Sequence, residues 1–536
     1  MHFNSELDCE IPSLDLLTLV FESPYSWAKE DTVIHAEAGN EANSLTKSQS
    51  ATLVRRLGYV LRTHLRIGKT GAGKDVVTCI CSNNLLNPIV FFAVISAGGV
   101  YSAASTALTV AELAWQIQSS KSHMIIATDD MAGAAVEAAQ KAHISPERVL
   151  ILDSMSLGRS LSPSTYRSCN YLTETRELPW EKIADTQILE TRVVALLYSS
   201  GTTGVPKGVR LSHKNFVAEA IITQAAIGTY LSRTNQKLNV EFEYRTLAHL
   251  PVAHISGLQG YFINGTMSGG TVFWMPKFIF DDFVYAAKRH RPTFISTVPS
   301  VYLRIAKSPS VSVEFHSLRH AQSGAAPMGP ELQKLAESKL KCKVSQAWGL
   351  TETTGAVTWL PWDCEDSTGS IGTLLPNTRI KIVNDDGCAV PDGHRGEILV
   401  KGPNVTMGDI GERRDRKFYV VDRKKELIKY KGLQVAPAEI EALLIGHNKI
   451  LDAAVIGIAD PAIPGNEIPR AFVVRKTEQS PVTEEEVKQY VTANLAAHKQ
   501  LRGGVAFIEQ VPRNLSGKIL RRKLAEKPEP QRPVKL

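Results

Sequence analysis

A loop of hydroxyls, glycines and one lysine occupies residues 198–208 (YSSGTTGVPKG). Glycines let backbone N–H groups approach a ligand closely, hydroxyls donate further hydrogen bonds, and lysine adds a compact positive charge. This combination suits polyanionic oxygen, and the phosphates of ATP are its natural ligand. The candidate phosphate ligands are Ser199, Ser200, Gly201, Thr202, Thr203, Gly204 and Lys207.

The loop departs from the P-loop of GTPases and ATPases. That pattern requires Gly before the lysine and Ser or Thr after it, whereas Pro206 precedes Lys207 and Gly208 follows it. The flanks, residues 192–198 and 209–211, both indicate strands. We therefore predict a strand–loop–strand hairpin rather than the strand–loop–helix of a P-loop. An ordinary glycine-rich hairpin is the alternative.

Four further clusters contain side chains that could complete a nucleotide site. Residues 323–327 (SGAAP) form a turn of small residues that lets a flat ligand reach the backbone. Residues 346–353 (QAWGLTET) combine an aromatic plane, a hydroxyl and a carboxylate. Residues 422–432 (DRKKELIKYKG) are rich in cations, and residues 512–518 (PRNLSGK) place Lys518 directly after a glycine.

The composition indicates a protein of two or more domains without a membrane span. A chain of 536 residues is too long for one core. Its longest apolar run, residues 88–101, is too short and glycine-broken to cross a bilayer. Seven sparse cysteines suggest reduced thiols and hence a cytoplasmic location. The final residues, VKL, match the peroxisomal address Ser-Lys-Leu in part, so a peroxisomal location is the alternative.

The net charge of +7 is concentrated near the C-terminus, in residues 513–535. A basic tail can bind nucleic acid. No aromatic residues interleave there and no nucleic-acid motif is recognised, so we expect no nucleic-acid partner. A solvated basic surface, or a basic surface that binds a phosphorylated substrate, explains the charge better than nucleic-acid binding does.

Helical and strand patterns alternate from about residue 48 to about residue 360, which predicts α/β layers. Turn signals then separate short strands from residue 379 onward, indicating a small β unit. We predict an α/β fold with a large multi-lobed N-terminal domain of mixed or parallel sheets (1–421). A hinge (422–425) and a small, mobile α+β C-terminal domain (426–536) follow.

Taken in order, these motifs resemble those of the adenylate-forming superfamily, which includes acyl-CoA synthetases, luciferases and nonribosomal-peptide adenylation domains. The resemblance runs from about residue 50 to about residue 525 and is strongest to the 4-coumarate–CoA ligase group, especially over residues 425–441. It implies a two-step reaction with ATP and coenzyme A. A carboxylate attacks the α-phosphate to give acyl-AMP and pyrophosphate, and the coenzyme A thiol then displaces AMP.

The resemblance also implies roles for individual residues. Phosphoryl transfer depends on positioning and charge neutralisation; Lys518 would lie between the carboxylate and the α-phosphate, which Thr351 would touch. Glu352 would help to hold Mg²⁺, which prefers oxygen ligands. The other implied ligands are Ala325, Gln346 and Trp348 beside the adenylate, Asp409 and Arg423 on the ribose, Lys429 and Gln434 on AMP, and Lys277, Lys431 and Gly432 along the coenzyme A path.

Two departures concern the nucleotide site. Trp348 stands where the family usually has tyrosine, but an indole still offers a stacking face for adenine. Relatives continue after Val405 for a longer stretch before the ribose-binding aspartate, and roughly two dozen residues, enough for a strand plus turns, are absent here. Either the gene was assembled wrongly, or the chain is a real variant with a trimmed face and weakened activity. Asp415 is then a second candidate for the ribose.

In this family the small domain rotates between the half-reactions. The resemblance implies that Lys518 would enter for the first and the Lys431–Gly432 segment for the second, with Lys425 at the pivot. Such rotation gates catalysis rather than performing it.

Residues 250–257 (LPVAHISG) mark the acyl pocket by resemblance, with His254 at its entrance. Ser256 and Gly324 are the other candidate substrate contacts. No Asp lies between residues 251 and 260 to pair with an amino acid's ammonium, so we expect an aromatic or medium-chain acid. Two alternatives to a CoA ligase remain. One is a ligase that transfers the acyl group to a carrier-protein thiol, and the other is a relative that binds nucleotide or acid without turnover.

Overall fold

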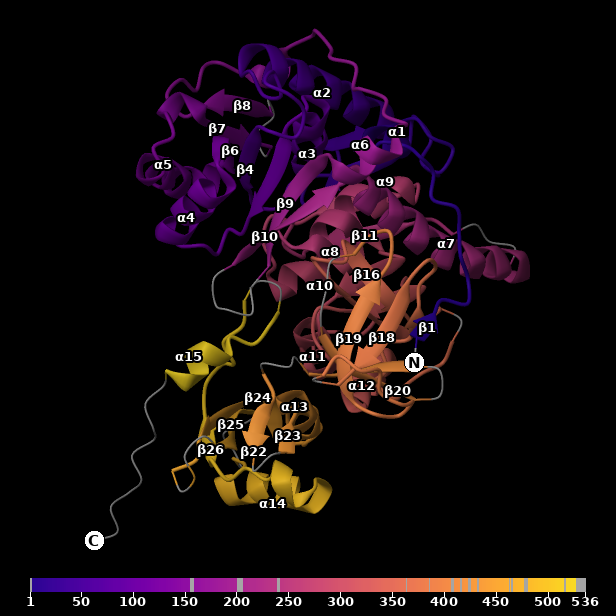
Figure 1. Ribbon diagram of the computed structural model, residues 1–536, viewed down its shortest axis with the longest axis vertical. Coiled ribbons are helices and arrows are strands. Elements are labelled where there is room, and N and C mark those ends of the chain that lie inside the picture. Colours follow the sequence, from indigo (N-terminus) through magenta and orange to yellow (C-terminus); the bar gives the residue numbers. More distant parts are fainter. Residues whose placement is uncertain are drawn as a thin grey trace.

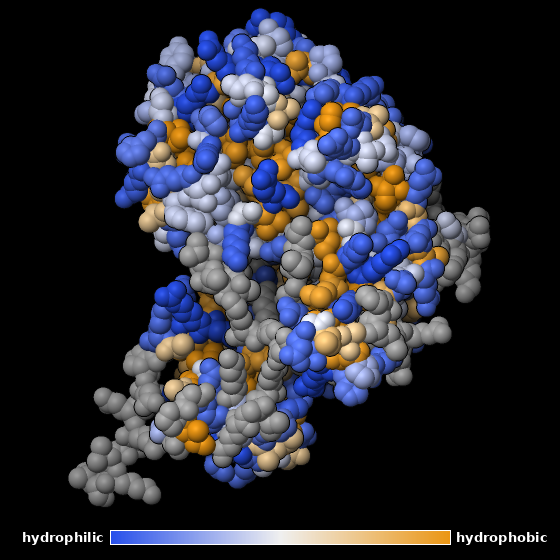
Figure 2. Space-filling view, viewed as in Figure 1, coloured by the Kyte–Doolittle hydropathy of each residue, from blue (hydrophilic) through white to orange (hydrophobic). Residues whose placement is uncertain are grey.

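The computed structural model describes residues 2–526 with several gaps. The gaps are residues 155–158, 200–205, 239–241, 363, 385, 406–408, 415–416, 423–425, 431–432, 462, 464–465, 477–480 and 515–516. A large N-terminal domain of several sheets lies above a small C-terminal domain, and helices α11 (Pro299–Lys307) and α12 (Pro330–Leu340) lie beside the junction (Figure 1). The outline narrows between the two domains, and most of the visible face is hydrophilic (Figure 2).

The first layer of the N-terminal domain is a seven-stranded sheet with the order β10-β9-β5-β4-β6-β7-β8. Its inner strands are parallel, and both edge strands are antiparallel to their neighbours. The strands are β4 (Val76–Ile80), β5 (Val100–Ala104), β6 (Ser122–Thr128), β7 (Val149–Asp153), β8 (Ser160–Pro163), β9 (Val193–Ser199) and β10 (Lys207–Ser212). The alternation seen in the sequence therefore forms the expected mixed sheet.

Burial explains why these segments adopt their structures. All residues of β4 and β5 are buried, as expected for parallel strands covered on both faces. Helix α3 (Asn87–Ser96) is also buried on every side, so the apolar run at residues 88–101 is a core helix and strand. Helix α4 (Val110–Ser120) begins with a capping box of Thr109 and Glu112, and α5 (Ala132–Lys141) packs beside it.

Two further sheets carry the rest of the candidate site. One has the order β13-β14-β15-β16-β17, and the other β11-β12-β2-β3. Their strands are β2 (Val33–Glu37), β3 (Ser44–Thr46), β11 (Arg245–Ala248), β12 (Thr271–Trp274), β13 (Phe294–Thr297), β14 (His320–Ser323), β15 (Val344–Leu350), β16 (Gly355–Trp359) and β17 (Thr373–Leu374). The helices around them are α1 (Leu16–Phe21), α2 (Lys47–Tyr59), α6 (Thr186–Thr191), α7 (His213–Leu238), α8 (Ile255–Gly257), α9 (Gly265–Met267) and α10 (Phe280–His290).

The predicted small β unit is an antiparallel sheet with the order β1-β18-β19-β20-β21. Strand β1 (His2–Asn4) comes from the N-terminus and pairs with β18, a long-range contact that the sequence did not indicate. The other strands are β18 (Arg379–Val383), β19 (Gly396–Lys401), β20 (Asp409–Arg414) and β21 (Lys417–Asp422).

The C-terminal domain has its own apolar core, which includes Ile440, Val455 and Val487. A separate core is the mark of a domain. Its elements are β22 (Ile428–Tyr430), β23 (Leu433–Val435), α13 (Pro437–Ile445), β24 (Ile450–Ala459), β25 (Glu467–Arg475), α14 (Glu484–Asn494), β26 (Val505–Phe507) and α15 (Arg521–Ala525). The predicted hinge includes Asp422, the last residue of β21; residues 423–425 lie outside the described residues, so the boundary stays a prediction.

No helix within the described parts of the chain is long and apolar enough to cross a membrane.

Candidate active site

The predicted phosphate loop joins two antiparallel strands, as expected from the sequence. Strand β9 ends at Ser199 and β10 begins at Lys207, and these two residues are paired across the hairpin. Lys207 is exposed, and Ser199 is half-buried. Residues 200–205, which include five of the predicted ligands, lie outside the described residues.

Ser199 joins this hairpin to a second sheet. Its Oγ donates a hydrogen bond to Glu352 Oε1 over 2.8 Å. Glu352 lies in the turn between β15 and β16, and Thr351 precedes it; both are half-buried. The structure therefore brings the predicted metal-binding carboxylate to the edge of the phosphate loop.

The turn that carries Glu352 is held by Thr353. Its hydroxyl accepts from Leu350 N (2.8 Å) and donates to Gly355 O (2.7 Å). Gly355 has a φ of +153°, and a Cβ there would lie 2.3 Å from Glu219 Oε1. Glycine is required because backbone and carboxylate approach so closely.

Glu219, on α7, anchors the same turn and was missed by the sequence analysis. Its two oxygens accept from Ala356 N (2.7 Å) and Asn404 Nδ2 (2.8 Å), and Asn404 O accepts from Thr354 Oγ1 (2.9 Å). Burial raises the pKa of Glu219 to about 8, against the opposing effect of both bonds. A lone glutamate in the apolar stretch 216–222 was the signal that could have revealed it.

The turn at residues 323–327 lies at the ends of β13 and β14. Gly324 N donates to Thr297 O (3.1 Å), and Ala325 has a left-handed φ of +66°. Gln346 lies behind this turn and is buried; its amide accepts from Met328 N (3.2 Å) and donates to Met328 O (3.0 Å). Gln346 thus fixes the turn beside which the adenylate is expected.

Trp348 lies on β15 with 8% of its surface exposed. It packs in an apolar cluster with Phe3, Val357 and Ile380, which belong to β1, β16 and β18. Its indole is therefore held in place by the small β sheet.

The predicted acid loop is linked to the same strand ends. His254 caps α8 by accepting from Ser256 N (3.3 Å), and its Nδ1 also bonds Ser256 Oγ (2.8 Å). A Cβ on Gly257 would lie 2.3 Å from Pro251 O, so the loop cannot accept a larger residue there without moving.

His249, which the sequence analysis did not single out, connects this loop to Thr297. Its Nδ1 is 3.0 Å from Leu247 O, which can only accept, so Nδ1 carries the proton. Nε2 then accepts from Thr297 Oγ1 over 2.7 Å. Burial lowers the pKa of His249 to about 4, so the ring is neutral. Thr297 thereby ties the acid loop to the turn of Gly324.

The loop of Lys518 packs on the N-terminal domain at this place. Gly517 has a φ of +78°, and a Cβ on it would lie 2.7 Å from Val298 Cγ2 and 3.1 Å from Ser300 Oγ. Val298 directly follows Thr297, and Lys518 is half-buried. The tertiary structure thus places Gly517, the residue before Lys518, next to the end of β13, where Thr297 bonds both Gly324 and His249.

The remaining predicted residues are placed only in part. Lys277 is exposed after β12. Lys429 on β22 pairs in register with Gln434 on β23, and Asp409 starts β20 and pairs with Ile398. Arg423, Lys425, Lys431, Gly432 and Asp415 lie outside the described residues. The C-terminal VKL also lies outside them.

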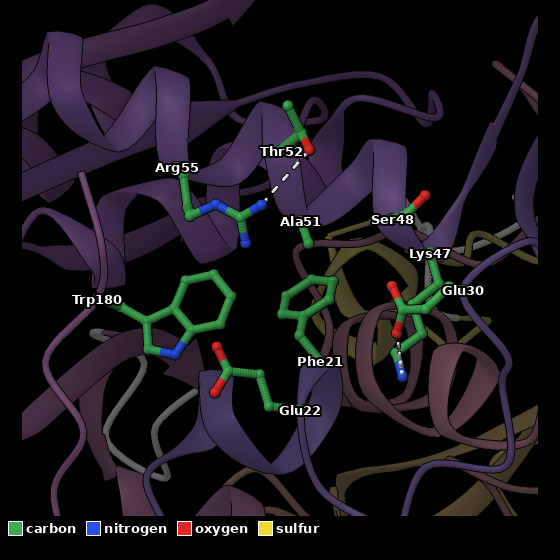
Figure 3. A pocket seen from close by; sticks show the side chains of 9 residues that line it. All are labelled: Phe21, Glu22, Glu30, Lys47, Ser48, Ala51, Thr52, Arg55 and Trp180. Atoms are coloured by element: carbon green, nitrogen blue, oxygen red, sulfur yellow. Dashed lines mark hydrogen bonds and ion pairs between the residues drawn. The ribbon is translucent and has the colours of Figure 1, made fainter. Parts of the chain in front are cut away.

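A cleft elsewhere on the N-terminal domain is a separate feature (Figure 3). It has a volume of about 290 Å³, and Lys47, Arg55 and Trp180 are among its lining residues. Both cations already pair with carboxylates, Lys47 with Glu30 (3.2 Å) and Arg55 with Glu177 (2.6 Å). None of the predicted site residues lines it, so we do not place the active site there.

Comparison with known proteins identifies the family of this chain. Residues 24–408 match the AMP-binding enzyme family, and residues 439–518 match the AMP-binding enzyme C-terminal domain. The chain therefore belongs to the AMP-binding enzymes of the adenylate-forming superfamily.

Its relatives are acyl-CoA synthetases. A protein of Emericella nidulans, provisionally named an acyl-coenzyme A synthetase, is 48% identical over 98% of each chain. A phenylacetyl-CoA ligase of Aspergillus niger is 32% identical over 98% of this chain and 99% of the relative, and 4-coumarate–CoA ligase 1 of Solanum tuberosum is 33% identical over 84% of each. The chain is an acid–thiol ligase that activates a carboxylic acid with ATP to acyl-AMP and forms the coenzyme A thioester.

Solved structures show the same fold. A benzoate CoA ligase of Burkholderia xenovorans superposes with a TM-score of 0.79 over 96% of this chain and all of the other, at 21% identity. The o-succinylbenzoate CoA synthetase of Bacillus subtilis, in complex with its acyl-adenylate, gives a TM-score of 0.73 over 96% of this chain and 98% of the other, at 25% identity.

Proposed function

We propose that this ligase acts on an aromatic or medium-chain carboxylic acid, bound between the acid loop at residues 250–257 and the turn at residues 323–327. The bonds from His249 to Thr297 and from Gly324 to Thr297 support a shared pocket. No acidic residue lies in residues 251–260 to bind an amino group. The phenylacetyl and 4-coumaryl ligases among the relatives favour arylacetic and phenylpropenoic acids as the first candidates.

Lys518 is the proposed catalytic cation of the first half-reaction. The contact of Gly517 with Val298 and Ser300 is the observation that carries this assignment, because it brings the loop of Lys518 to the proposed acid site. An ammonium there would neutralise charge as the carboxylate attacks the α-phosphate. Thr351 and the 198–208 loop would hold the phosphates.

Glu352 is the proposed protein ligand of Mg²⁺. Its carboxylate lies beside Ser199, and Mg²⁺ is commonly held by one or two carboxylates together with substrate phosphates. No group of three or more His, Cys, Asp or Glu side chains forms a metal site among the described residues, which fits a site completed by ATP. When bound, the ion would neutralise the negative charge of the phosphates.

The second half-reaction is proposed to follow rotation about residues 422–425, with Lys425 as the pivot. Lys277, Lys431 and Gly432 would then line the path of coenzyme A. Asp409 and Arg423 would hold the ribose, and Lys429 and Gln434 would contact AMP. A carrier-protein thiol is the alternative acceptor.

Acid-dependent ATP–pyrophosphate exchange tests the proposal. A panel of benzoic, arylacetic, phenylpropenoic and fatty acids should give exchange with at least one aromatic or medium-chain member. Adding coenzyme A should then yield a thioester, whereas thioester formation only on a carrier protein would support the alternative acceptor. No exchange with any acid would indicate a relative that binds without turnover.

A further inference from the structure

Helix α11 contacts the C-terminal domain at both of its ends. Its first turn meets the loop of Lys518, since Ser300 and the preceding Val298 lie against Gly517. Its last residue, Lys307, reaches the same domain from the other end. One rigid helix of nine residues therefore connects two points of the domain junction.

Lys307 holds the C-terminal domain through backbone carbonyls. Its Nζ donates to Ile450 O, to Leu451 O (3.2 Å) and, at the limit of bonding distance, to Ile445 O (3.5 Å). Ile445 ends α13 and Ile450 begins β24. The C-terminal end of a helix carries partial negative charge and suits a cation, and charge-assisted hydrogen bonds are the stronger kind.

Lys307 stays protonated at neutral pH although its surroundings lower its pKa. Burial and the neighbouring Lys476 lower the pKa of Lys307 to about 8, while Asp452 acts in the opposite direction. The ammonium form therefore predominates at neutral pH and has three protons to donate.

The carbonyls that Lys307 holds are connected to the loop of Lys518 through Asp452 and Arg513. Asp452 follows Leu451 and binds Arg513 Nη2 through both oxygens (2.9 and 3.2 Å). Arg513 Nη1 donates in turn to Gly517 O (3.1 Å). A short series of bonds thus runs from Lys307 to the residue next to Lys518.

We propose that Lys307 is a positioning residue for acid activation, which holds the C-terminal domain in the orientation that delivers Lys518. The inference rests on the role assigned to Lys518 above. The contacts of Lys307 join the two domains, so rotation for thioester formation breaks them. A residue whose bonds form in only one orientation of the C-terminal domain stabilises that orientation and raises its population relative to the other.

The first test compares the two half-reactions in the full-length Lys307→Met variant, which keeps an unbranched apolar side chain one atom shorter and loses the ammonium donors. We expect kcat for ATP–pyrophosphate exchange to fall about tenfold, with the KM for acid and ATP little changed. Thioester formation from supplied acyl-adenylate and coenzyme A should be unchanged or faster. The Lys307→Arg variant retains donors and should recover most of the exchange.

Arg304 supplies the matched control. It lies one turn earlier on α11 and stacks on Phe280 within the N-terminal domain, 4.5 Å from the ring centre. The Arg304→Met variant should leave both half-reactions at the wild-type rate. Parallel loss of both half-reactions in Lys307→Met, or an equal effect of Arg304→Met, would overturn the inference.

A second test measures the orientation without using activity. A Cβ on Gly329, the residue that caps the start of α12, would lie 2.8 Å from Ala442 Cβ on α13. Cysteines at these two positions can therefore form a disulfide after a small shift. In this double-cysteine background, Lys307→Met should slow disulfide formation about tenfold, as followed on non-reducing gels. The protein without the two added cysteines controls for its native thiols.

The two tests separate the possible failures. Equal crosslinking rates with and without Lys307 would overturn the positioning role, whatever the activity. Absence of exchange in the wild-type enzyme would instead overturn the proposed function, and the crosslinking rates would still decide whether Lys307 holds the domain. Recovery of exchange in Lys307→Met after oxidation of the cysteine pair would show that orientation was what the substitution had removed.

Discussion

Ser199 Oγ and Glu352 Oε1 are joined by a 2.8 Å hydrogen bond, although the two residues are 153 positions apart in the chain. Ser199 ends β9 of the seven-stranded sheet, and Glu352 follows β15 of another sheet. The bond brings together two motifs, the loop proposed to bind phosphate and the carboxylate proposed to bind magnesium.

Replacing Glu352 with Gln keeps its shape and removes its charge. We expect exchange to fall by about a hundredfold and the Mg²⁺ concentration needed for half-maximal rate to rise, as measured in a magnesium titration. Ser199→Ala should have a smaller effect because it removes one neutral donor. The exposed Glu365, paired with Lys343, gives a control in Glu365→Gln. A normal magnesium dependence in Glu352→Gln would contradict the metal assignment.

Lys518→Ala should nearly abolish adenylation and leave thioester formation from supplied acyl-AMP largely intact. The physical reason is that the cation neutralises charge only while the carboxylate attacks the α-phosphate. Single-turnover measurement of each half-reaction checks this. The exposed Lys523 on α15 provides the control, Lys523→Ala. Equal loss of both steps would argue against a rotating domain.

The Glu219→Gln variant should change how stability depends on pH. Burial raises the pKa of Glu219 from 4.5 to about 8. Between these values the folded protein keeps a proton that the unfolded chain has released, so wild-type stability falls as pH rises, by up to ~1.4 kcal/mol per unit. The variant has no such proton, so its stability relative to wild type should increase from about pH 5.5 to about pH 8.

Urea unfolding of both proteins at the two pH values measures this difference. Glu365→Gln, at an exposed carboxylate, should follow the wild-type curve. Parallel curves for wild type and Glu219→Gln would show that Glu219 is ionised in the folded protein.

Gly257→Ala tests the packing of the acid loop. Its Cβ would lie 2.3 Å from Pro251 O, so the loop must move, at a cost of about 1–3 kcal/mol. We expect a lower melting temperature and a raised KM for the acid, with KM for ATP less affected. Gly260→Ala is the control because a Cβ there meets nothing within 4 Å. An unchanged acid KM would separate this loop from the acid pocket.

The local features of the site could be predicted from the sequence. The hairpin around residues 198–208 is predicted by two apolar strands and the glycines between them, because neighbouring residues alone decide such a turn. The α/β alternation, a small β unit after residue 379 and a small C-terminal domain were predicted on the same basis; the structure shows the β unit as an antiparallel sheet and gives the C-terminal part its own core. The resemblance to adenylate-forming enzymes supplied the family, which the comparisons confirm.

The partners of individual side chains could not be predicted in this way. Gln346 turns its amide to the backbone of Met328, and Glu219 binds Asn404 from 185 positions away. The periodicity of a strand predicts the face of the sheet on which a side chain lies. It does not predict which residues of other elements pack against that face.

The sequence by itself determined the chemistry available to this protein: a hydroxyl-rich loop for phosphate, a carboxylate for a hard cation, and a lysine after Gly517. Only the tertiary structure decided that Gly517 rests on Val298 and that Lys307 reaches Ile450 and Leu451. The reason is physical. Contacts between domains depend on how two separately folded cores pack against each other. The order of residues along the chain does not specify the distance between residues of different domains.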